Sequence, residues 1–144
     1  FCTLAAVAIN LKTGAILGAN AGHHPMVVVS RERSSTLLEA TGPPIGIMSG
    51  LSWNDERAEI GPGETMVLYT DGIVEARAGV TMAAGDGEVL EYGAHNLMEI
   101  ARAREAAGPQ GLIEAVIHDV DRYCSPLLPH DDCTLIALRY NGNG

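Results

Sequence analysis

The sequence predicts a layered α+β domain. Three observations predict it. β-rich runs separated by turn residues fill the first half of the chain, helical periodicity begins near residue 94, and one more strand follows the helices. Strands grouped before helices favour a layered α+β domain over βαβ units. With 144 residues and 47% hydrophobic content, we assign one domain to residues 1–140 and a disordered tail to 141–144.

The expected strands alternate with turn residues. The runs 2–11 and 15–20 flank a Lys-Thr-Gly turn, which is typical of a short hairpin with glycine in the left-handed conformation. Further strands are expected at 25–30, 35–40, 53–60 and 64–70. The last of these is apolar on both alternating faces, so it predicts a strand covered from both sides.

Two helices are expected after these strands. Residues 94–107 place Leu97, Ile100, Ala101 and Arg104 on one helical face, and the helix is expected to end at Gly108-Pro109. Apolar residues repeat at helical spacing again over 112–123, and residues 133–140 return to a strand pattern.

Acidic residues stand where two of these strands end or begin. Asp71 follows the run 64–70, and Asp131 and Asp132 precede the run 133–140. If the two strands are antiparallel neighbours, all three acids fall at one edge of the sheet. Such repulsion is relieved either by a raised carboxyl pKa or, more commonly with oxygen ligands, by a bound hard cation such as Mg²⁺ or Mn²⁺. Gly72 would let the chain approach such a cation closely. The alternative is solvated acids in ordinary strand-end turns.

Composition narrows the class of partner. A formal charge of −9 disfavours nucleic acid and anionic lipid. Three widely spaced cysteines suggest neither a disulfide framework nor a zinc knuckle, so we expect a cytoplasmic protein. No apolar run is long enough to span a membrane. The chain begins inside an apolar segment without Met, so we expect it to be an excerpt of a longer protein.

Other residues admit different chemistry. His23, His24 and His130 could form a zinc site beside the acids, although adjacent histidines point in different directions. Cys133 could be read as a nucleophile, but a small apolar residue at the start of a strand is favoured because no basic partner is placed to lower its pKa. Glu75 is either a neighbour of the metal shell or a solvent-facing acid.

Five motifs occur along the chain in a fixed order: "ANAGHHP" (19–25), "GPPIG" (42–46), "GPGETMVLYTDGIVEA" (61–76), "EYGAHNL" (91–97) and "HDDCTLIAL" (130–138). Together they resemble the pattern of the bacterial SpoIIE/RsbU-type serine phosphatases of the metal-dependent protein phosphatase superfamily. The resemblance implies an αββα sandwich of two antiparallel sheets with flanking helices. It also implies a two-ion Mn²⁺ or Mg²⁺ centre that hydrolyses phosphoserine or phosphothreonine.

Residue by residue, the resemblance makes Asp71 and Asp131 metal ligands at the catalytic centre. Asp132 is either a ligand or a neighbour of the metal shell. Asn20, Gly22 and His23 match the AGH signature, which we interpret as shaping a loop rather than taking part in the chemistry. Similar enzymes commonly act on a STAS-type anti-sigma-antagonist phosphoprotein in bacterial stress response or sporulation signalling, so we expect such a substrate here.

The upstream half of the family pattern, with its GDxxD-like and DxxGHG-like motifs, does not occur in these 144 residues. "GDGE" (85–88) is interpreted as a polar turn. The domain is therefore expected to be truncated at its N-terminus, with little or no activity by itself and an exposed sheet edge near residues 2–11 through which a homodimer could form. The alternatives are a catalytically silent phosphatase-like module that binds a regulatory partner, and an unrelated antiparallel β binding domain.

Overall fold

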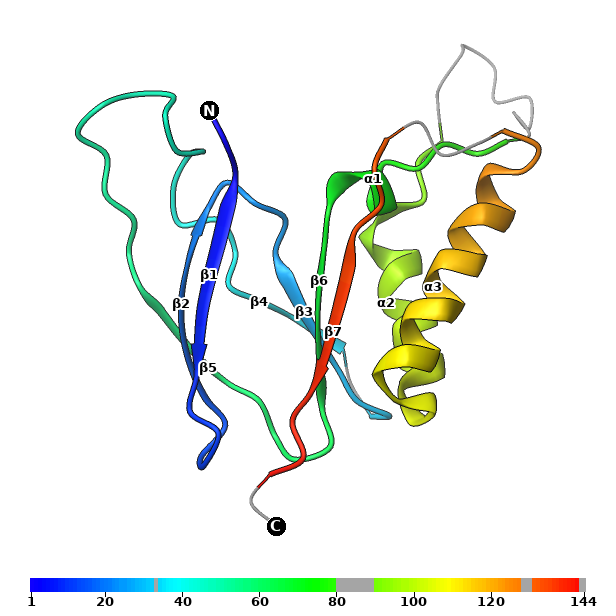
Figure 1. Ribbon diagram of the computed structural model, residues 1–144, viewed down its shortest axis with the longest axis horizontal. Coiled ribbons are helices and arrows are strands. Elements are labelled where there is room, and N and C mark those ends of the chain that lie inside the picture. Colours follow the sequence, from blue (N-terminus) through cyan, green and yellow to red (C-terminus); the bar gives the residue numbers. More distant parts are fainter. Residues whose placement is uncertain (33, 80–89, 128–130, 143–144) are drawn as a thin grey trace.

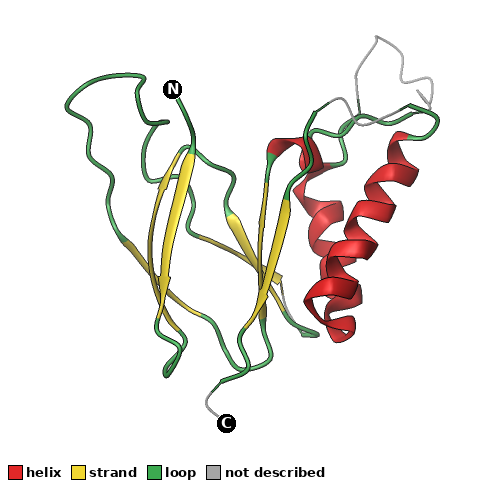
Figure 2. Ribbon diagram, in the orientation of Figure 1, coloured by secondary structure: helices red, strands yellow, loops and turns green. Residues whose placement is uncertain are grey.

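The computed structural model describes residues 1–32, 34–79, 90–127 and 131–142. Two antiparallel sheets stack on each other, and helices cover the outer face of one of them (Figure 1, Figure 2). The predicted layered α+β class is therefore confirmed. The predicted turn at 85–88 and His130 lie outside the described residues, as do residues 143–144 of the predicted tail.

The first sheet has the order β1 (Leu4–Ile9), β2 (Ala15–Ala21), β5 (Glu56–Glu59). β1 and β2 form the predicted hairpin, in register from Leu4 opposite Ala21 to Ile9 opposite Ile16. Gly14 in its turn has φ +76°, and a Cβ there would collide with the carbonyl oxygen of Ile60. The hairpin therefore requires glycine at this position.

The second sheet has the order β4 (Ser34–Leu37), β3 (Met26–Val29), β6 (Thr65–Tyr69), β7 (Leu135–Arg139). β6 lies between β3 and β7 and is antiparallel to both. Val67 and Tyr69 belong to the core beneath the helices, whereas Met66 belongs to the core between the sheets. The prediction that residues 64–70 form a strand covered from both sides is confirmed.

The helices α2 (Gly93–Arg104) and α3 (Gly108–Cys124) form the outer layer, and the short α1 (Asp71–Val74) follows β6 (Figure 2). Leu97 and Ala101 of α2 pack with Leu112 and Val116 of α3 in the core against β3 and β6. Burial of these apolar faces fixes the helices on the sheet.

The predicted end of the first helix is wrong by several residues. α2 ends at Arg104, a 3-10 turn η1 (Glu105–Ala107) follows, and α3 begins at Gly108. Proline is favoured in the first helical turn, so Gly108-Pro109 starts α3. Arg104, which we expected on the apolar face, is exposed.

The sandwich is open on one side, between β1 and β7. Among the described residues β1 pairs as a strand only with β2, which confirms the predicted exposed edge. On β7, Ile136 and Leu138 pair with Leu68 and Met66, whose side chains enter the core between the sheets. Ile136 and Leu138 nevertheless remain 55% and 39% exposed, because the first sheet does not extend over them.

Within the described part of the chain, no helix is long and apolar enough to cross a membrane.

Candidate active site

The pairing of β6 with β7 brings the predicted acids to one end of the second sheet. Tyr69 at the end of β6 pairs with Leu135 at the start of β7, and the Thr70 N–H donates to the Thr134 carbonyl over 3.1 Å. In Figure 1, α1 begins at this end of β6, beside the start of β7. Asp71 and the pair Asp131-Asp132 therefore lie at the same sheet edge, as the antiparallel arrangement predicted.

The Thr70 hydroxyl ties the two strand ends together. It donates to the Asp132 carbonyl over 3.0 Å and accepts the Thr134 N–H over 3.0 Å. The backbone around the Asp131-Asp132 pair is thus positioned by a side chain that directly precedes Asp71. Sequence reasoning missed this role, although a Thr follows or precedes the acids in both motifs, "YTDG" and "DDCT".

Gly72 allows the two acidic segments to approach each other. A Cβ at Gly72 would lie 2.6 Å from the carbonyl oxygen of Asp132 and 2.9 Å from its carbonyl carbon. Both atoms belong to the backbone, so they could not move aside cheaply. Gly72 thus lies against the segment that carries Asp131 and Asp132, and its close approach to a metal stays a prediction.

All three carboxylates are exposed. Asp71 Oδ1 accepts the N–H of Gly72 over 2.9 Å, and Asp131 Oδ1 accepts the N–H of Asp132 over 2.8 Å. These contacts orient the side chains and leave carboxylate oxygens directed to solvent, which is the donor type that Mg²⁺ and Mn²⁺ prefer.

The donor set is incomplete, however. Among the described residues no three His, Cys, Asp or Glu side chains gather closely enough to hold a metal ion. The acids therefore supply the right type of oxygen ligand for a hard cation. The described residues do not supply enough such ligands to complete a site.

Cys133 makes a structural contact beside the acids. Its thiol donates to the Gly72 carbonyl over 3.2 Å. Partial burial raises the pKa of the Cys133 thiol, and the neighbouring Cys124 and acidic side chains raise it further. A thiol kept protonated is a poor nucleophile, which supports the structural interpretation of this residue.

The loop that carries the AGH signature is held by a buried amide. Asn20 is 0% exposed, and its Nδ2 donates to the carbonyls of His23 and Leu38 over 3.0 and 2.9 Å. Its Oδ1 accepts the His23 N–H over 2.8 Å. Gly22 has φ +71°, and a Cβ there would lie 2.6 Å from Pro44. The prediction that Asn20 and Gly22 shape a loop agrees with these contacts.

His23 and His24 do not form a common metal site. Their rings are 6.5 Å apart and nearly perpendicular, and His24 stacks on Tyr69 at 5.7 Å. His130, the third residue of the zinc alternative, lies outside the described residues.

A cavity of about 270 Å³ opens between the sheets at the same end as the acids. It is lined by Thr3, Leu4, Ala5, His23, Leu68, Tyr69, Thr70, Thr134 and Ile136. Thr70 and Thr134, which lie close to the acids in sequence, therefore line the cavity together with His23. Burial raises the pKa of the Tyr69 phenol above its ordinary value.

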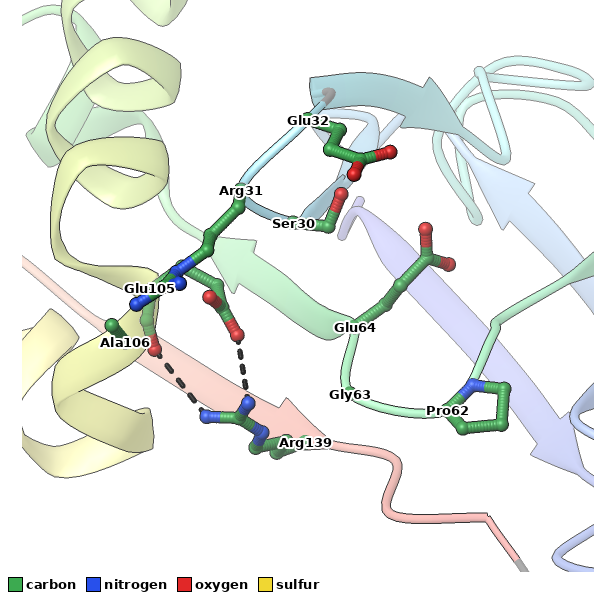
Figure 3. A pocket seen from close by; sticks show the side chains of 9 residues that line it. All are labelled: Ser30, Arg31, Glu32, Pro62, Gly63, Glu64, Glu105, Ala106 and Arg139. Carbon is green, nitrogen blue, oxygen red and sulfur yellow. Dashed lines mark hydrogen bonds and ion pairs between the residues drawn. The ribbon is translucent and has the colours of Figure 1, made fainter.

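A larger hollow of about 580 Å³ lies at the opposite end of β6 and β7, where Gly63 and Glu64 precede one strand and Arg139 ends the other. Figure 3 shows the Arg139 guanidinium paired there with Glu105, at 3.0 Å from its carboxylate and 3.4 Å from its backbone carbonyl. This ion pair joins η1 to β7. The acids at the other end of the sheet, not the size of this hollow, identify the candidate active site.

Comparison with protein families gives a match over nearly the whole chain. Residues 1–141 match the model for Stage II sporulation protein E, SpoIIE. The chain is 28% identical over 141 residues to protein IcfG of Synechocystis and 31% identical over 78 residues to phosphoserine phosphatase RsbP of Bacillus subtilis. These alignments cover 98% and 54% of this chain but only 21% and 19% of the two relatives, so the chain spans about a fifth of their length.

Solved structures share the fold. The PP2C phosphatase domain of SpoIIE from Bacillus subtilis, solved with a fragment of its regulatory domain, superposes with a TM-score of 0.74 at 19% identity, over 99% of this chain and 39% of that one. The RsbU and RsbW domains of Rv1364c from Mycobacterium tuberculosis give 0.73 at 21% identity, over 99% and 38%. The layered sheets are thus those of PP2C-type phosphatase domains.

The family match over residues 1–141 leads to one conclusion, with which the shared fold agrees: the chain belongs to the SpoIIE family.

Proposed function

We propose that this chain is part of a metal-dependent protein serine/threonine phosphatase that hydrolyses phosphoserine on a signalling protein. The observation that carries the proposal is the convergence of Asp71 with Asp131 and Asp132 at one end of the β6–β7 pair. Carboxylates gathered at a sheet edge beside a cavity are suited to a hard cation and a phosphoryl group.

In this proposal Asp71 and Asp131 hold Mn²⁺ or Mg²⁺, and Asp132 is a further ligand or orients one. When bound, such ions activate water and neutralise the charge that develops on the phosphoryl oxygens. The Thr70 hydroxyl keeps the Asp131-Asp132 backbone beside Asp71, and Gly72 leaves room for that backbone. Structures of similar fold include a manganese-presoaked SpoIIE phosphatase domain and RsbX with magnesium.

The proposal assigns little or no activity to these 144 residues by themselves. Two cations held close together repel each other, and bridging carboxylates must offset that repulsion. The described residues offer no group of three suitable side chains. In this proposal further ligands come from outside the described residues. The matched regions make up only about a fifth of each of the two relatives.

For the substrate we propose a STAS-type anti-sigma-antagonist phosphoprotein in a bacterial stress or sporulation pathway, encountered in the cytoplasm. One relative is a phosphoserine phosphatase, and one similar structure joins an RsbU to an RsbW domain. The exposed edge of β1 is a proposed surface for a homodimer, because an edge strand can pair with another chain.

A catalytically silent phosphatase-like module that binds a regulatory partner is the second candidate. The incomplete donor set among the described residues favours it. Activity of the full-length protein decides between the two.

The test uses the full-length protein that contains this chain, with Mn²⁺ and a phosphoserine peptide. We expect metal-dependent release of phosphate, abolished in Asp71→Asn and retained in Asp55→Asn, which changes an exposed acid before β5. Equal activity in Asp71→Asn would contradict the assignment of the site. An inactive wild-type protein that still binds a partner would support the silent module.

A further inference from the structure

His23 lies at the end of the sheet where the acids gather. β3 and β6 are antiparallel, with Val27 opposite Val67, so residues before β3 lie beside residues that follow β6. The stacking of His24 on Tyr69 confirms this alignment one residue from His23. His23 itself lines the cavity of about 270 Å³ together with Thr70, the residue before Asp71.

Both polar groups of the His23 backbone, the N–H and the carbonyl, form hydrogen bonds. The buried Asn20 side chain donates to the His23 carbonyl and accepts the His23 N–H. Burying an amide costs free energy unless its polar atoms form hydrogen bonds. In the buried Asn20, both the amide nitrogen and the amide oxygen form them. The loop is therefore a rigid support for the residue that it carries into the cavity.

The imidazole ring is oriented as well. Its Nδ1 lies 3.0 Å from the His24 carbonyl oxygen, which can only accept, so Nδ1 carries a hydrogen. Across the described part of the chain, Nε2 makes no hydrogen bond to a protein atom. This arrangement leaves Nε2 available to a ligand, with the tautomer set by a backbone carbonyl.

The cavity suits one phosphorylated side chain. Its volume is about 270 Å³. Leu4, Leu68 and Ile136 supply apolar walls, whereas Thr3 and Thr70 are polar residues of the lining. An apolar wall beside a reacting group strengthens the electrostatic contacts made there.

We propose, resting on the phosphatase function above, that His23 is a further catalytic residue that donates a proton from Nε2 to the serine oxygen leaving the phosphorus. Water attacks phosphorus and forms a new P–O bond, the bond to the serine oxygen breaks, and its electron pair stays on that oxygen. The oxygen takes the Nε2 proton of the imidazolium. The products are inorganic phosphate and a free serine hydroxyl, and His23 regains from solvent a proton equivalent to the one lost by the attacking water.

The proposed proton donation by His23 can be measured because the serine alkoxide is a poor leaving group. A serine alkoxide needs protonation to leave, whereas p-nitrophenolate does not, so a proton donor matters for one substrate and hardly for the other. The experiment compares a phosphoserine peptide with p-nitrophenyl phosphate in the Mn²⁺-loaded full-length protein. The variants are His23→Gln and His23→Asn. The shorter asparagine amide can keep the contact that Nδ1 makes with the His24 carbonyl, but it lacks Nε2.

We expect both variants to lose about 10²-fold or more in kcat on the phosphopeptide and less than about tenfold on p-nitrophenyl phosphate. The matched control is His24→Gln, which alters the neighbouring ring and should affect both substrates equally. Thermal unfolding and Mn²⁺ affinity of the His23 variants should match the wild type.

Three results would overturn the proposal. Equal losses on the two substrates would make His23 a support of the loop or a metal ligand, and unchanged activity would remove it from the reaction. A wild-type protein inactive on both substrates would instead overturn the phosphatase function, and this proposal with it.

Discussion

Gly72 lies directly against the backbone of Asp132, so that a methyl group at position 72 would be 2.6 Å from the Asp132 carbonyl oxygen. Overpacking against backbone costs about 1 to 3 kcal/mol, and relief requires the Asp131-Asp132 segment to move. Gly72→Ala should therefore lower the free energy of unfolding by about 2 kcal/mol and weaken Mn²⁺ binding in the full-length protein.

Gly61→Ala is the matched control for that change. The three atoms nearest to a Cβ at Gly61 all belong to the Glu64 side chain, at 3.4 Å or more. Urea unfolding and calorimetric Mn²⁺ titration should show little change in this variant. A Gly72→Ala protein as stable and as competent for metal as the wild type would contradict the close approach described here.

Thr70 should couple the strand ends to the metal site. Thr70→Val removes the hydroxyl that bonds Asp132 and Thr134, so two backbone groups lose a partner. We expect a loss of about 1 to 2 kcal/mol in unfolding free energy and weaker Mn²⁺ binding. Thr70→Ser keeps the hydroxyl and should retain both properties. Equal behaviour of the valine and serine variants would show that the hydroxyl does not position the acids.

The ion pair at the other end of the sheet should be structural. The Glu105 side chain is only 5% exposed, so removing its partner leaves a buried carboxylate. Arg139→Met should destabilise the protein by about 3 kcal/mol, whereas the double variant Arg139→Met with Glu105→Gln should recover part of that loss. Chemical unfolding of both variants measures the difference. A fully stable Arg139→Met protein would mean that η1 is not held by this pair.

Tyr92 predicts a pH dependence of stability. Burial, and then the hydrogen bond from its hydroxyl to Asp119 at 2.8 Å, raise the pKa of Tyr92 above its ordinary value of 10.0. Above that pH the unfolded chain releases the phenolic proton and the folded chain keeps it. The contribution of Tyr92 to the free energy of unfolding is therefore complete below pH 10.0. It is lost as the pH rises toward the pKa of Tyr92 in the folded chain.

Urea unfolding across this alkaline range checks the sign. The contribution of Tyr92 to the slope is about −1.4 kcal/mol per pH unit, and Tyr92→Phe should remove it while Tyr69 and Tyr123 still contribute their own. Identical slopes in the two proteins would contradict the assignment.

The strands were predictable because their signals are local. Alternation reflects neighbours within a few residues, and a turn glycine such as Gly14 reflects its own backbone conformation, with φ +76°. The apolar faces of residues 64–70 directly reflect two buried sides. The gathering of Asp71 with Asp131 and Asp132 followed from one further assumption, that β6 and β7 are neighbours. The structure confirms that pairing.

What sequence reasoning missed depends on distant contacts. The start of α3 at Gly108 was mistaken for a helix end, because Gly-Pro is compatible with both, and Gly108 takes φ +75° between η1 and α3. The burial of Glu105 requires Arg139, which lies on β7. α1 has only four residues, too few to show helical periodicity.

The most direct test of the account is a calorimetric titration of Mn²⁺ into the full-length protein, beside Asp71→Asn, Asp131→Asn and the control Asp55→Asn. The account predicts saturable binding in the wild type and the control, and affinity reduced about tenfold or more in each of the other two variants. Equal affinity in all four proteins would show that the acids at the β6–β7 edge do not hold the metal.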